Sequence, residues 1–261
     1  MTARAPDWIT QLERVAAAQG GFFHPWRSRL ASENGENAYT ALVQRHLTPD
    51  LDVLEPGCGH GVDALQFAPG VRSYRAYDAV EGFLRVASRA ARAQAIGNLE
   101  FVLADTSPKR NAGQVRLPAA SSSVDLFVSR RGPTHWILDT PRVARPGAVL
   151  LQLNPMGGDP AEWEPDLPAG LRLPNETGSI EDRIAGLLSR ARLEFCEKWV
   201  FDVPEYLPDP EQLYAMSSWL LESAPAFEDC RPELERIFER HATDDGLMVR
   251  QRRFLWKAVV S

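Results

Sequence analysis

The chain has few cysteines, no long apolar run and no excess of positive charge. Its three cysteines, Cys58, Cys196 and Cys230, are odd in number and far apart, without the CxxC or Cys/His spacing of a zinc site. We therefore expect free thiols in a reducing compartment and no metal. No segment approaches about 18 continuous apolar residues, which argues against a membrane-spanning helix. The N-terminus lacks a basic stretch followed by an apolar run, so we expect no signal peptide and a soluble, cytoplasmic protein.

The charge balance disfavours nucleic acid as an electrostatic partner of the whole chain. Among 261 residues, 29 are Lys or Arg and 35 are Asp or Glu, which gives a net charge of −6. A local basic patch is still compatible with that balance. The chain is 44% hydrophobic and 25% charged, as is typical of globular proteins. At about 150 residues per domain, its length indicates one large domain with an appendage.

From residue 49 onward, short apolar runs alternate with helical stretches, the pattern of βαβ units around a parallel sheet. We predict a doubly wound α/β fold with a seven-stranded, mostly parallel sheet in residues 49–261, with a loop insertion near 155–178. Residues 1–48 are predicted to form a helical N-terminal extension or lid. The strands are expected at 52–55, 73–78, 99–104, 124–129, 148–154, 195–203 and 252–260. The helices are expected at 7–19, 36–47, 81–95, 179–192, 210–223 and 232–240.

The segment LDVLEPGCGHG, residues 51–61, is the most informative part of the sequence. A short apolar strand ends at Glu55, and glycines follow at Gly57, Gly59 and Gly61. Glycine is needed where the backbone turns tightly and approaches a ligand without an intervening Cβ. A helix beginning near Val62 would direct its N-terminal amides into the same crevice, where ligands of open α/β sheets bind.

Two classes of nucleotide-binding protein have a glycine turn of this kind, and the first is the dinucleotide-binding class. A dinucleotide fingerprint requires G-x-G-x-x-G, whereas this chain has G-x-G-x-G with Val62 in the place of the last glycine. Glu55 stands directly before the turn, where a pyrophosphate would be repelled. A ligand with a positive centre suits Glu55 better, which argues against NAD.

The run Glu55-x-Gly57-x-Gly59-x-Gly61 resembles motif I of the class I S-adenosylmethionine-dependent methyltransferases. Asp78 ends the next strand, 21 residues after Gly57, and Asp105 follows the third. The resemblance covers residues 36–154 and implies that the last two strands are the family's sixth and seventh. It also implies S-adenosylmethionine as cofactor and S-adenosylhomocysteine as product, with Asp78 accepting the ribose hydroxyls and Asp105 facing the adenine amino group. Each of these two acids could instead be a simple strand-end turn residue. The implied cofactor contacts are Glu55, Gly57, Cys58, Gly59, Gly61, Asp78, Ala79, Asp105, Thr106 and Ser129.

By this resemblance, the reaction is in-line transfer of a methyl group from the sulfonium to an acceptor. The protein mainly has to position the acceptor and exclude water, and a general base is needed only for an acceptor that carries a proton. The segment SRRGPTHW, residues 129–136, departs from the Asn-Pro-Pro-Tyr motif of methyltransferases that act on aromatic amino nitrogens. It also lacks the Pro-Cys nucleophile of pyrimidine-carbon methyltransferases. His135 is a candidate general base, although a helix cap or a surface position is the simpler interpretation.

Four further residues are candidates for contacts with the substrate. Arg130 or Arg131 could fork onto a carboxylate or phosphate of the substrate or of the methionine moiety. Alternatively, either could pair with a nearby acid such as Asp105 or Asp125. His24 and Trp26 belong to an aromatic segment that resembles the family's lid, and a hydrophobic staple onto the core explains that segment as well.

Three functions are compatible with the sequence. The favoured one is a methyltransferase acting on a small molecule. The second is a methyltransferase acting on ribosomal or transfer RNA, and the third is a cofactor-binding protein without transferase activity. Residues 196–245 hold 13 acidic and only four basic residues, which disfavours a nucleic-acid backbone nearby. The sequence leaves the acceptor and the oligomeric state open. The RNA hypothesis rests on a phosphate track formed by Lys109, Arg110, Arg130, Arg131, Arg250, Arg252 and Arg253.

Overall fold

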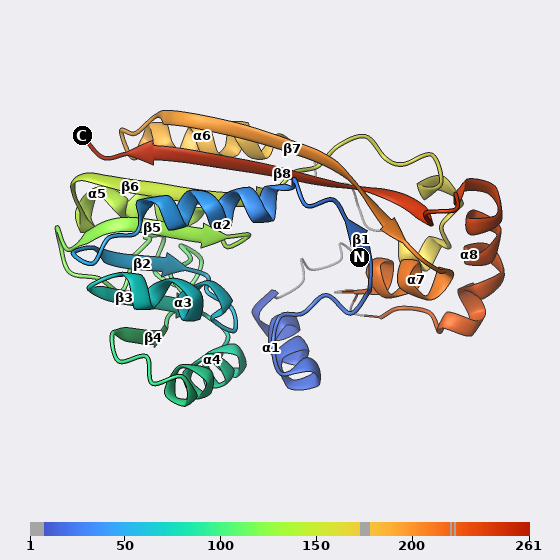
Figure 1. Cartoon of the computed structure of the whole chain (residues 1–261), viewed down its shortest axis with the longest axis horizontal. Helices are drawn as coiled ribbons and strands as arrows, with labels where there is room; N and C mark the ends of the chain where they lie inside the picture. The colour runs from blue at the N-terminus through green and yellow to red at the C-terminus, as the bar shows by residue number, and fades with distance from the viewer. Residues whose placement is uncertain (1–7, 173–177, 220, 222) are drawn as a thin grey trace.

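The computed structural model describes residues 8–172, 178–219, 221 and 223–261. It contains an eight-stranded sheet flanked by helices, with strand order β1-β7-β8-β6-β5-β2-β3-β4 (Figure 1). The strands are β1 Arg29–Leu30, β2 Asp52–Pro56, β3 Ser73–Asp78, β4 Leu99–Leu103, β5 Val124–Arg130, β6 Ala144–Pro155, β7 Phe195–Leu207 and β8 Leu247–Val259.

Five of the strands, β6, β5, β2, β3 and β4, pair in parallel. The other three add antiparallel pairings, with β8 between β6 and β7 and β1 on the outer edge of β7. All seven predicted strands are present, but the predicted count is one too low. The missed strand, β1, has only two residues, opposite Tyr206 and Glu205 of β7, and so short a strand shows no periodicity in the sequence.

The helices that cover the sheet begin and end near their predicted positions, with two exceptions. α8 begins at Phe227, five residues before the predicted start at Pro232, which lies inside the helix rather than at its first position. α7 ends at Ser218 instead of residue 223. The helices are α1 Trp8–Gln19, α2 Gly35–His46, α3 Val62–Phe67, α4 Glu81–Ala93, α5 Thr140–Val143, α6 Ile180–Arg190, α7 Pro210–Ser218 and α8 Phe227–His241.

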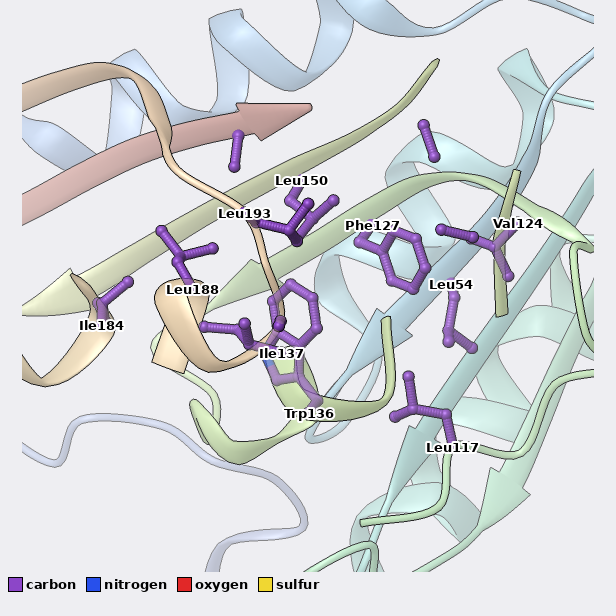
Figure 2. Packing of buried hydrophobic residues seen from close by; sticks show 14 of the residues in the cluster. Leu54, Leu117, Val124, Phe127, Trp136, Ile137, Leu150, Ile184, Leu188 and Leu193 are labelled. Atoms are coloured by element: carbon purple, nitrogen blue, oxygen red, sulfur yellow. The ribbon is translucent and has the colours of Figure 1, made fainter. Parts of the chain in front are cut away.

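Side chains of the central strands alternate between two hydrophobic layers, as the period of two along a strand requires. On the side of α5 and α6, Trp136 stacks on Phe127, with ring centroids 5.7 Å apart (Figure 2). The Trp256 ring also stacks on Trp136, at 6.3 Å. On the other side, the neighbours Val53 and Leu126 pack with buried residues of α2, α3 and α4. The sheet is therefore covered on both faces, and its carboxyl edge is left for a ligand site.

A third hydrophobic cluster lies at the far end of the long β7–β8 ribbon, beyond the carboxyl edge of the sheet (Figure 1). It joins α7 and α8 to the predicted loop insertion, from which Trp163, Leu167 and Leu171 are buried. Two short 3-10 helices, Glu164–Asp166 and Ala169–Leu171, shape that loop. Residues 173–177 of the insertion lie outside the described residues. Among the helices that the structure describes, none has both the length and the apolarity to cross a bilayer.

Candidate functional site

A cavity of about 2080 Å³ lies at the carboxyl ends of the parallel strands. Its walls are the loops after β2, β3, β4 and β5, together with α1, the 155–164 segment and part of β8. Typical small-molecule sites occupy about 300–1000 Å³, so this cavity has room for a cofactor and a second molecule. Eight of the predicted cofactor contacts line it: Glu55, Gly57, Cys58, Gly59, Asp78, Ala79, Asp105 and Thr106.

The glycine turn after β2 presents bare backbone to this cavity. Gly57 has φ +69°, and a Cβ there would lie 2.5 Å from Pro133 Cδ, so only glycine fits. The N–H groups of Gly57 and Cys58 both donate to the Tyr77 carbonyl, at 2.9 and 3.0 Å, which ties the turn to β3. At Gly59, φ +53°, a Cβ would have no neighbour within 4 Å. The open face of the turn is therefore available to a ligand.

Gly61 and Ser129, the other two predicted cofactor contacts, do not line the cavity. A Cβ at Gly61 would come within 2.9 Å of both Ala87 and Phe101, so this glycine lets α3 pack closely on its neighbours. The fully buried Ser129 hydroxyl donates to the Pro56 carbonyl at 2.9 Å. Both residues support the turn from beneath.

Two carboxylates stand at the ends of the adjacent strands β3 and β4. Asp78 Oδ2 accepts the Gly59 N–H at 2.8 Å, and its Oδ1 accepts the Val80 N–H at 2.9 Å. Burial raises the pKa of Asp78, and these backbone hydrogen bonds oppose that shift. Asp105 Oδ1 accepts the Ser107 N–H, whereas its buried Oδ2 has no hydrogen-bond partner and lies 3.3 Å from Arg110 Nε. The pair offers acceptors for the hydroxyl and amino groups of a ligand.

Glu55 is buried beneath the turn, where the Tyr74 hydroxyl donates to its Oε2 at 2.9 Å. Burial, and then the charge of Asp63, raise the pKa of Glu55 well above its ordinary value. A cationic group of a ligand in the adjoining cavity would favour the ionised form of this carboxyl.

His135 lies beside the residues that follow β4. Its Nε2 is 2.9 Å from Thr106 Oγ1, which is in turn 3.2 Å from the Tyr77 hydroxyl. Burial lowers the pKa of His135 and the charge of Asp105 opposes that shift, so the ring is neutral at pH 7. The chain thus places His135 on the same wall of the cavity as Asp105, with Nε2 already engaged.

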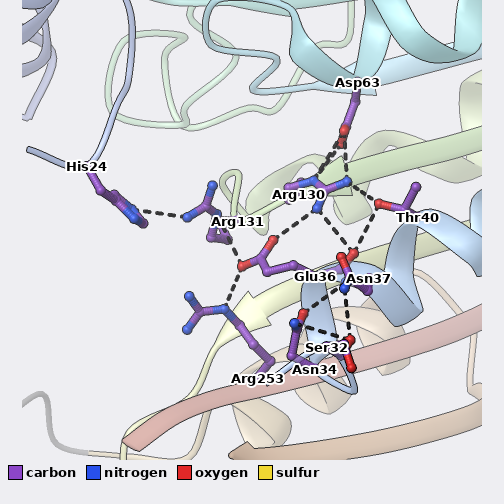
Figure 3. Close-up of polar contacts among 10 residues, drawn as sticks. All are labelled: His24, Ser32, Asn34, Glu36, Asn37, Thr40, Asp63, Arg130, Arg131 and Arg253. Carbon is purple, nitrogen blue, oxygen red and sulfur yellow. Dashed lines mark hydrogen bonds and ion pairs between the residues drawn. The ribbon is translucent and has the colours of Figure 1, made fainter. Parts of the chain in front are cut away.

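The guanidinium of Arg130 is fully engaged by the protein (Figure 3). Nε and Nη2 donate to Asp63, Nη1 donates to Glu36 at 3.0 Å, and Nη2 also donates to Thr40 at 2.8 Å. A further contact from Nη1 to the Glu36 carbonyl occupies the last N–H. The group also lies 4.7 Å from the centre of the Tyr39 ring. Arg130 therefore holds α2 and α3 against the end of β5.

This arrangement corrects two interpretations of Arg130. The predicted substrate contact has no N–H left for a substrate, although the residue reaches the cavity wall. The suggested partners, Asp105 and Asp125, lie instead beside Arg110 and Arg145.

Arg131, the next residue, makes far fewer hydrogen bonds than Arg130. Its backbone is left-handed, with φ +58°, which is uncommon outside glycine and often marks a functional position. Nη1 lies 3.2 Å from His24 Nε2, and the buried Nε has no hydrogen bond, 3.7 Å from Glu36 Oε1. The side chain lines the cavity.

The N-terminal segment covers the cavity from the side of α4. Glu13 of α1 accepts the Glu81 N–H at 2.8 Å, at the first residue of α4. The Phe22 N–H donates to Nδ1 of His60 in the glycine turn, at 3.1 Å. His60 is a docking residue that sequence reasoning missed, because its partner is 38 positions away. These contacts fix the lid to the two loops that carry the proposed ligand groups.

The two predicted lid residues form an aromatic stack. The His24 and Trp26 rings are nearly parallel, with centroids 4.3 Å apart, and Trp219 packs edge-on against both. Trp26 lines the cavity, whereas His24 stands behind it and contacts Arg131. Only Trp26 is therefore placed to touch a molecule in the cavity directly.

Comparison with solved structures identifies the fold. A functionally unknown protein from Deinococcus radiodurans R1 matches with a TM-score of 0.67 and 26% identity over 95% of this chain and 98% of that one. The geranyl diphosphate C-methyltransferase from Streptomyces coelicolor A3(2) matches with a TM-score of 0.58 and 12% identity over 99% and 100%. An S-adenosylmethionine-dependent methyltransferase from Aquifex aeolicus matches with a TM-score of 0.51 and 13% identity over 85% and 88%. The sequence matches no family model and no curated protein.

The chain has the fold of the class I S-adenosylmethionine-dependent methyltransferases. In this methyltransferase fold, β7 and β8 are the sixth and seventh strands expected from the sequence, with β8 inserted antiparallel between β6 and β7. The glycine turn, Asp78 and Asp105 lie at the carboxyl ends of its first three strands, β2, β3 and β4.

Docking of the lid onto the methyltransferase fold is expected to weaken in acid. Packing between aromatic rings removes water from His24 and, with the charges of Arg131 and Arg253, lowers its pKa from 6.5 to about 4 against the opposing charges of Glu205 and Glu36. Undocked, His24 regains an ordinary pKa and binds the proton more readily. The stability of docking therefore falls as pH drops from about 6.5 toward 4. Amide hydrogen exchange of residues 20–26, corrected for intrinsic rates, should be faster at pH 5.0 than at pH 7.5.

The variant His24→Gln should lose part of this pH response, because His60, whose pKa burial also lowers, still accepts the Phe22 N–H. The variant His46→Gln, at the C-terminal end of α2, should keep the full response. Exchange in α6 serves as the internal reference. Equal acceleration of α6 would mean global destabilisation and would contradict a lid-specific effect.

Proposed function

We propose that the protein is an S-adenosylmethionine-dependent methyltransferase that acts on a small-molecule acceptor. The observation that carries this proposal is the Asp78 carboxylate, which is held by the N–H groups of Gly59 and Val80 beside the open face of the glycine turn. A carboxylate fixed in this way is pre-organised to accept two hydroxyl groups of a ribose. The buried Oδ2 of Asp105, which makes no hydrogen bond and lies 3.3 Å from Arg110 Nε, is a matching acceptor for an amino group.

The residues present suit the proposed cofactor chemically. Glu55 is a carboxyl group near the turn whose ionised form a cationic ligand would favour, and no phosphate-binding lysine or arginine stands within the turn itself. When bound, S-adenosylmethionine supplies a methyl group already activated by the sulfonium. What this chain contributes is orientation and the exclusion of water, for which α1 and residues 22–26 cover the cavity.

His135 has a positioning role in this proposal. With Nε2 engaged by Thr106, it fixes the loop after β4 beside the proposed adenine contact. A base role would fall to Nδ1, and it would be required only for an acceptor that carries a proton.

The charges of the cavity support a small acceptor over RNA. The arginines near β5 and β8 do converge, but eight acidic residues line the same cavity, among them Asp159, Glu162 and Glu205. Arg110 and Arg250 lie beside Asp105 and Asp202. A phosphate track needs an uninterrupted basic surface, and these acids interrupt it.

The test is calorimetric titration with S-adenosylmethionine, S-adenosylhomocysteine and NAD in parallel. We expect micromolar binding of the two sulfur compounds and none of NAD; no binding of either sulfur compound would contradict the proposal. Turnover is then measured with methyl-labelled cofactor and two acceptor pools, total RNA and the low-mass fraction of a cell extract. Label in the low-mass pool supports a small acceptor, and label in RNA supports the second candidate. Binding without transfer to either pool supports a cofactor-binding protein.

A further inference from the structure

Three arginines line the wall of the cavity formed by β5 and β8. Arg131 directly follows β5, and Arg252 and Arg253 are neighbours on β8. All three line the cavity, and their side chains keep only 27%, 20% and 13% of their surface exposed. Figure 3 shows Arg131 and Arg253 reaching the Glu36 carboxylate from two sides.

The arginines at this wall outnumber the carboxylates with which they form ion pairs. Glu36 is shared by Arg130, Arg131 and Arg253, while Asp63 is held by Arg130. Farther along β8, Asp202 is shared by Arg250 and Arg252. These five guanidinium groups face three carboxylates. Glu205 and Asp159 also line the cavity; the Ser28 hydroxyl donates to Glu205, and the five arginines are ion-paired in the described residues with Glu36, Asp63 and Asp202 only.

Two of the arginines also carry a buried N–H that lies near a carboxylate but makes no hydrogen bond to it: Arg131 Nε is 3.7 Å from Glu36, and Arg252 Nε is 3.3 Å from Asp202. Burial, opposed by Glu36 but reinforced by Arg253 and Arg130, lowers the pKa of Arg131. A buried donor whose hydrogen bond is not made is unfavourable, and an anion that accepts from it removes that penalty.

The fold makes room for this cluster at a specific residue. A Cβ at Gly158 would lie only 1.0 Å from Arg252 Nη1, so the guanidinium rests directly on the backbone of the 155–160 loop. Any larger side chain at this position would displace Arg252 from the wall. The loop insertion and β8 therefore form this part of the cavity together.

The position of Arg252 and Arg253 separates them from the proposed nucleoside contacts. Asp78 and Asp105 follow β3 and β4, whereas Arg252 and Arg253 are on β8, three strands from β2 in the order β8-β6-β5-β2. Neighbouring strands are about 4.8 Å apart, so roughly 14 Å of sheet separates the glycine turn's strand from β8. A molecule bound at β8 is thus the acceptor and not the adenosine of the cofactor.

We propose that the methyl acceptor is anionic and that Arg131, Arg252 and Arg253 bind its carboxylate or phosphate group. This inference rests on the proposed function, because it assigns the other half of the cavity to the cofactor. Planar guanidinium groups recognise either anion through paired N–H donors, and charge-assisted bonds of this kind are about twice as strong as neutral ones.

The test uses the full chain saturated with S-adenosylhomocysteine and titrated with phenyl phosphate, benzoate and benzyl alcohol. We expect an anionic probe to bind at least tenfold more tightly than benzyl alcohol, with an affinity that falls as NaCl rises from 50 to 300 mM. A preference for phenyl phosphate identifies a phosphate site, and a preference for benzoate identifies a carboxylate site.

Substitutions of the arginines test whether they bind the anionic probe. Arg131→Gln and Arg253→Gln should each weaken the anionic probe at least tenfold, while Arg131→Lys retains part of the affinity. Glutamine is as strained as arginine at φ +58°, so Arg131→Gln leaves the backbone unchanged. The matched control is Arg190→Gln, an exposed residue at the end of α6.

Two results would overturn the inference. One is an anionic probe that binds no better than benzyl alcohol, or equally well to both Gln variants. The other is a tenfold loss of S-adenosylhomocysteine affinity in Arg131→Gln with unchanged probe binding, which would assign Arg131 to the carboxylate of the methionine moiety. If S-adenosylhomocysteine itself does not bind, the proposed function fails, and titration of the unliganded protein still tests the arginine site.

Discussion

Replacing Asp78 by alanine is expected to weaken the binding of S-adenosylhomocysteine at least tenfold. The two carboxylate oxygens each accept one backbone N–H and keep further lone pairs for a ligand on the cavity side. Charge-assisted hydrogen bonds to two hydroxyl groups contribute about 1.5–3 kcal/mol, and about 1.4 kcal/mol already corresponds to tenfold. Calorimetric titration of the purified variant measures this loss directly.

Alanine at this position also removes the acceptor for the Gly59 and Val80 N–H groups, which could loosen the turn itself. Asp78→Asn separates the two effects, since it retains the size of the side chain and one acceptor oxygen. It should lose cofactor affinity with a smaller loss of thermal stability than Asp78→Ala. Asp50→Ala, at an exposed site before β2, should change neither quantity. An unchanged affinity in Asp78→Ala would exclude Asp78 from the binding site.

The part of the site that follows from the sequence is the part built from local segments. Each of Glu55, Asp78 and Asp105 stands at or just after the end of an apolar strand, and in a parallel sheet those ends meet at one edge. The glycine spacing also predicts the turn from a local segment, because the need for positive φ at Gly57 and Gly59 is a property of the turn itself.

The remainder of the site depends on residues that are distant in the chain. Glu36 and Arg253 are 217 positions apart, and they meet because the N-terminus of α2 packs against β8. Nothing around Arg130 indicates that Asp63, 67 positions earlier, will occupy its donors. Sequence patterns report which face of an element is apolar, but they do not report which charged groups two distant elements bring together.

The third hydrophobic cluster illustrates the same limit. Trp163, Leu213 and Leu234 come from a loop and two helices that share no periodic pattern. They are joined because β7 and β8 extend past the sheet as a ribbon of two 13-residue strands. Both predicted strands are too short. The outer end of β7, residues 203–207, does not alternate between buried and exposed residues, whereas the outer end of β8, residues 247–250, does alternate but is only four residues long.

Replacing Arg130 by alanine is expected to lower the free energy of unfolding by about 3–5 kcal/mol, the range for breaking a buried ion pair from one side. The loss arises mainly at Asp63, whose side chain is only 3% exposed and would be left without the guanidinium that now donates to it. Glu36 would retain Arg131 and Arg253 and should contribute less. Urea unfolding followed by circular dichroism measures the difference.

A double variant identifies the cause of this loss. In Arg130→Met with Asp63→Asn, neither an unpaired cation nor an unpaired carboxylate remains, so the double variant should be more stable than Arg130→Met alone. Arg131→Ala removes a neighbouring guanidinium whose carboxylate, Glu36, keeps its ion pairs with Arg130 and Arg253, so it should cost much less. If Arg130→Ala lost under about 1 kcal/mol and instead weakened the anionic probe, the guanidinium would be a ligand contact after all. The contrast between two adjacent arginines thus separates a residue that holds three elements together from one that is free to bind.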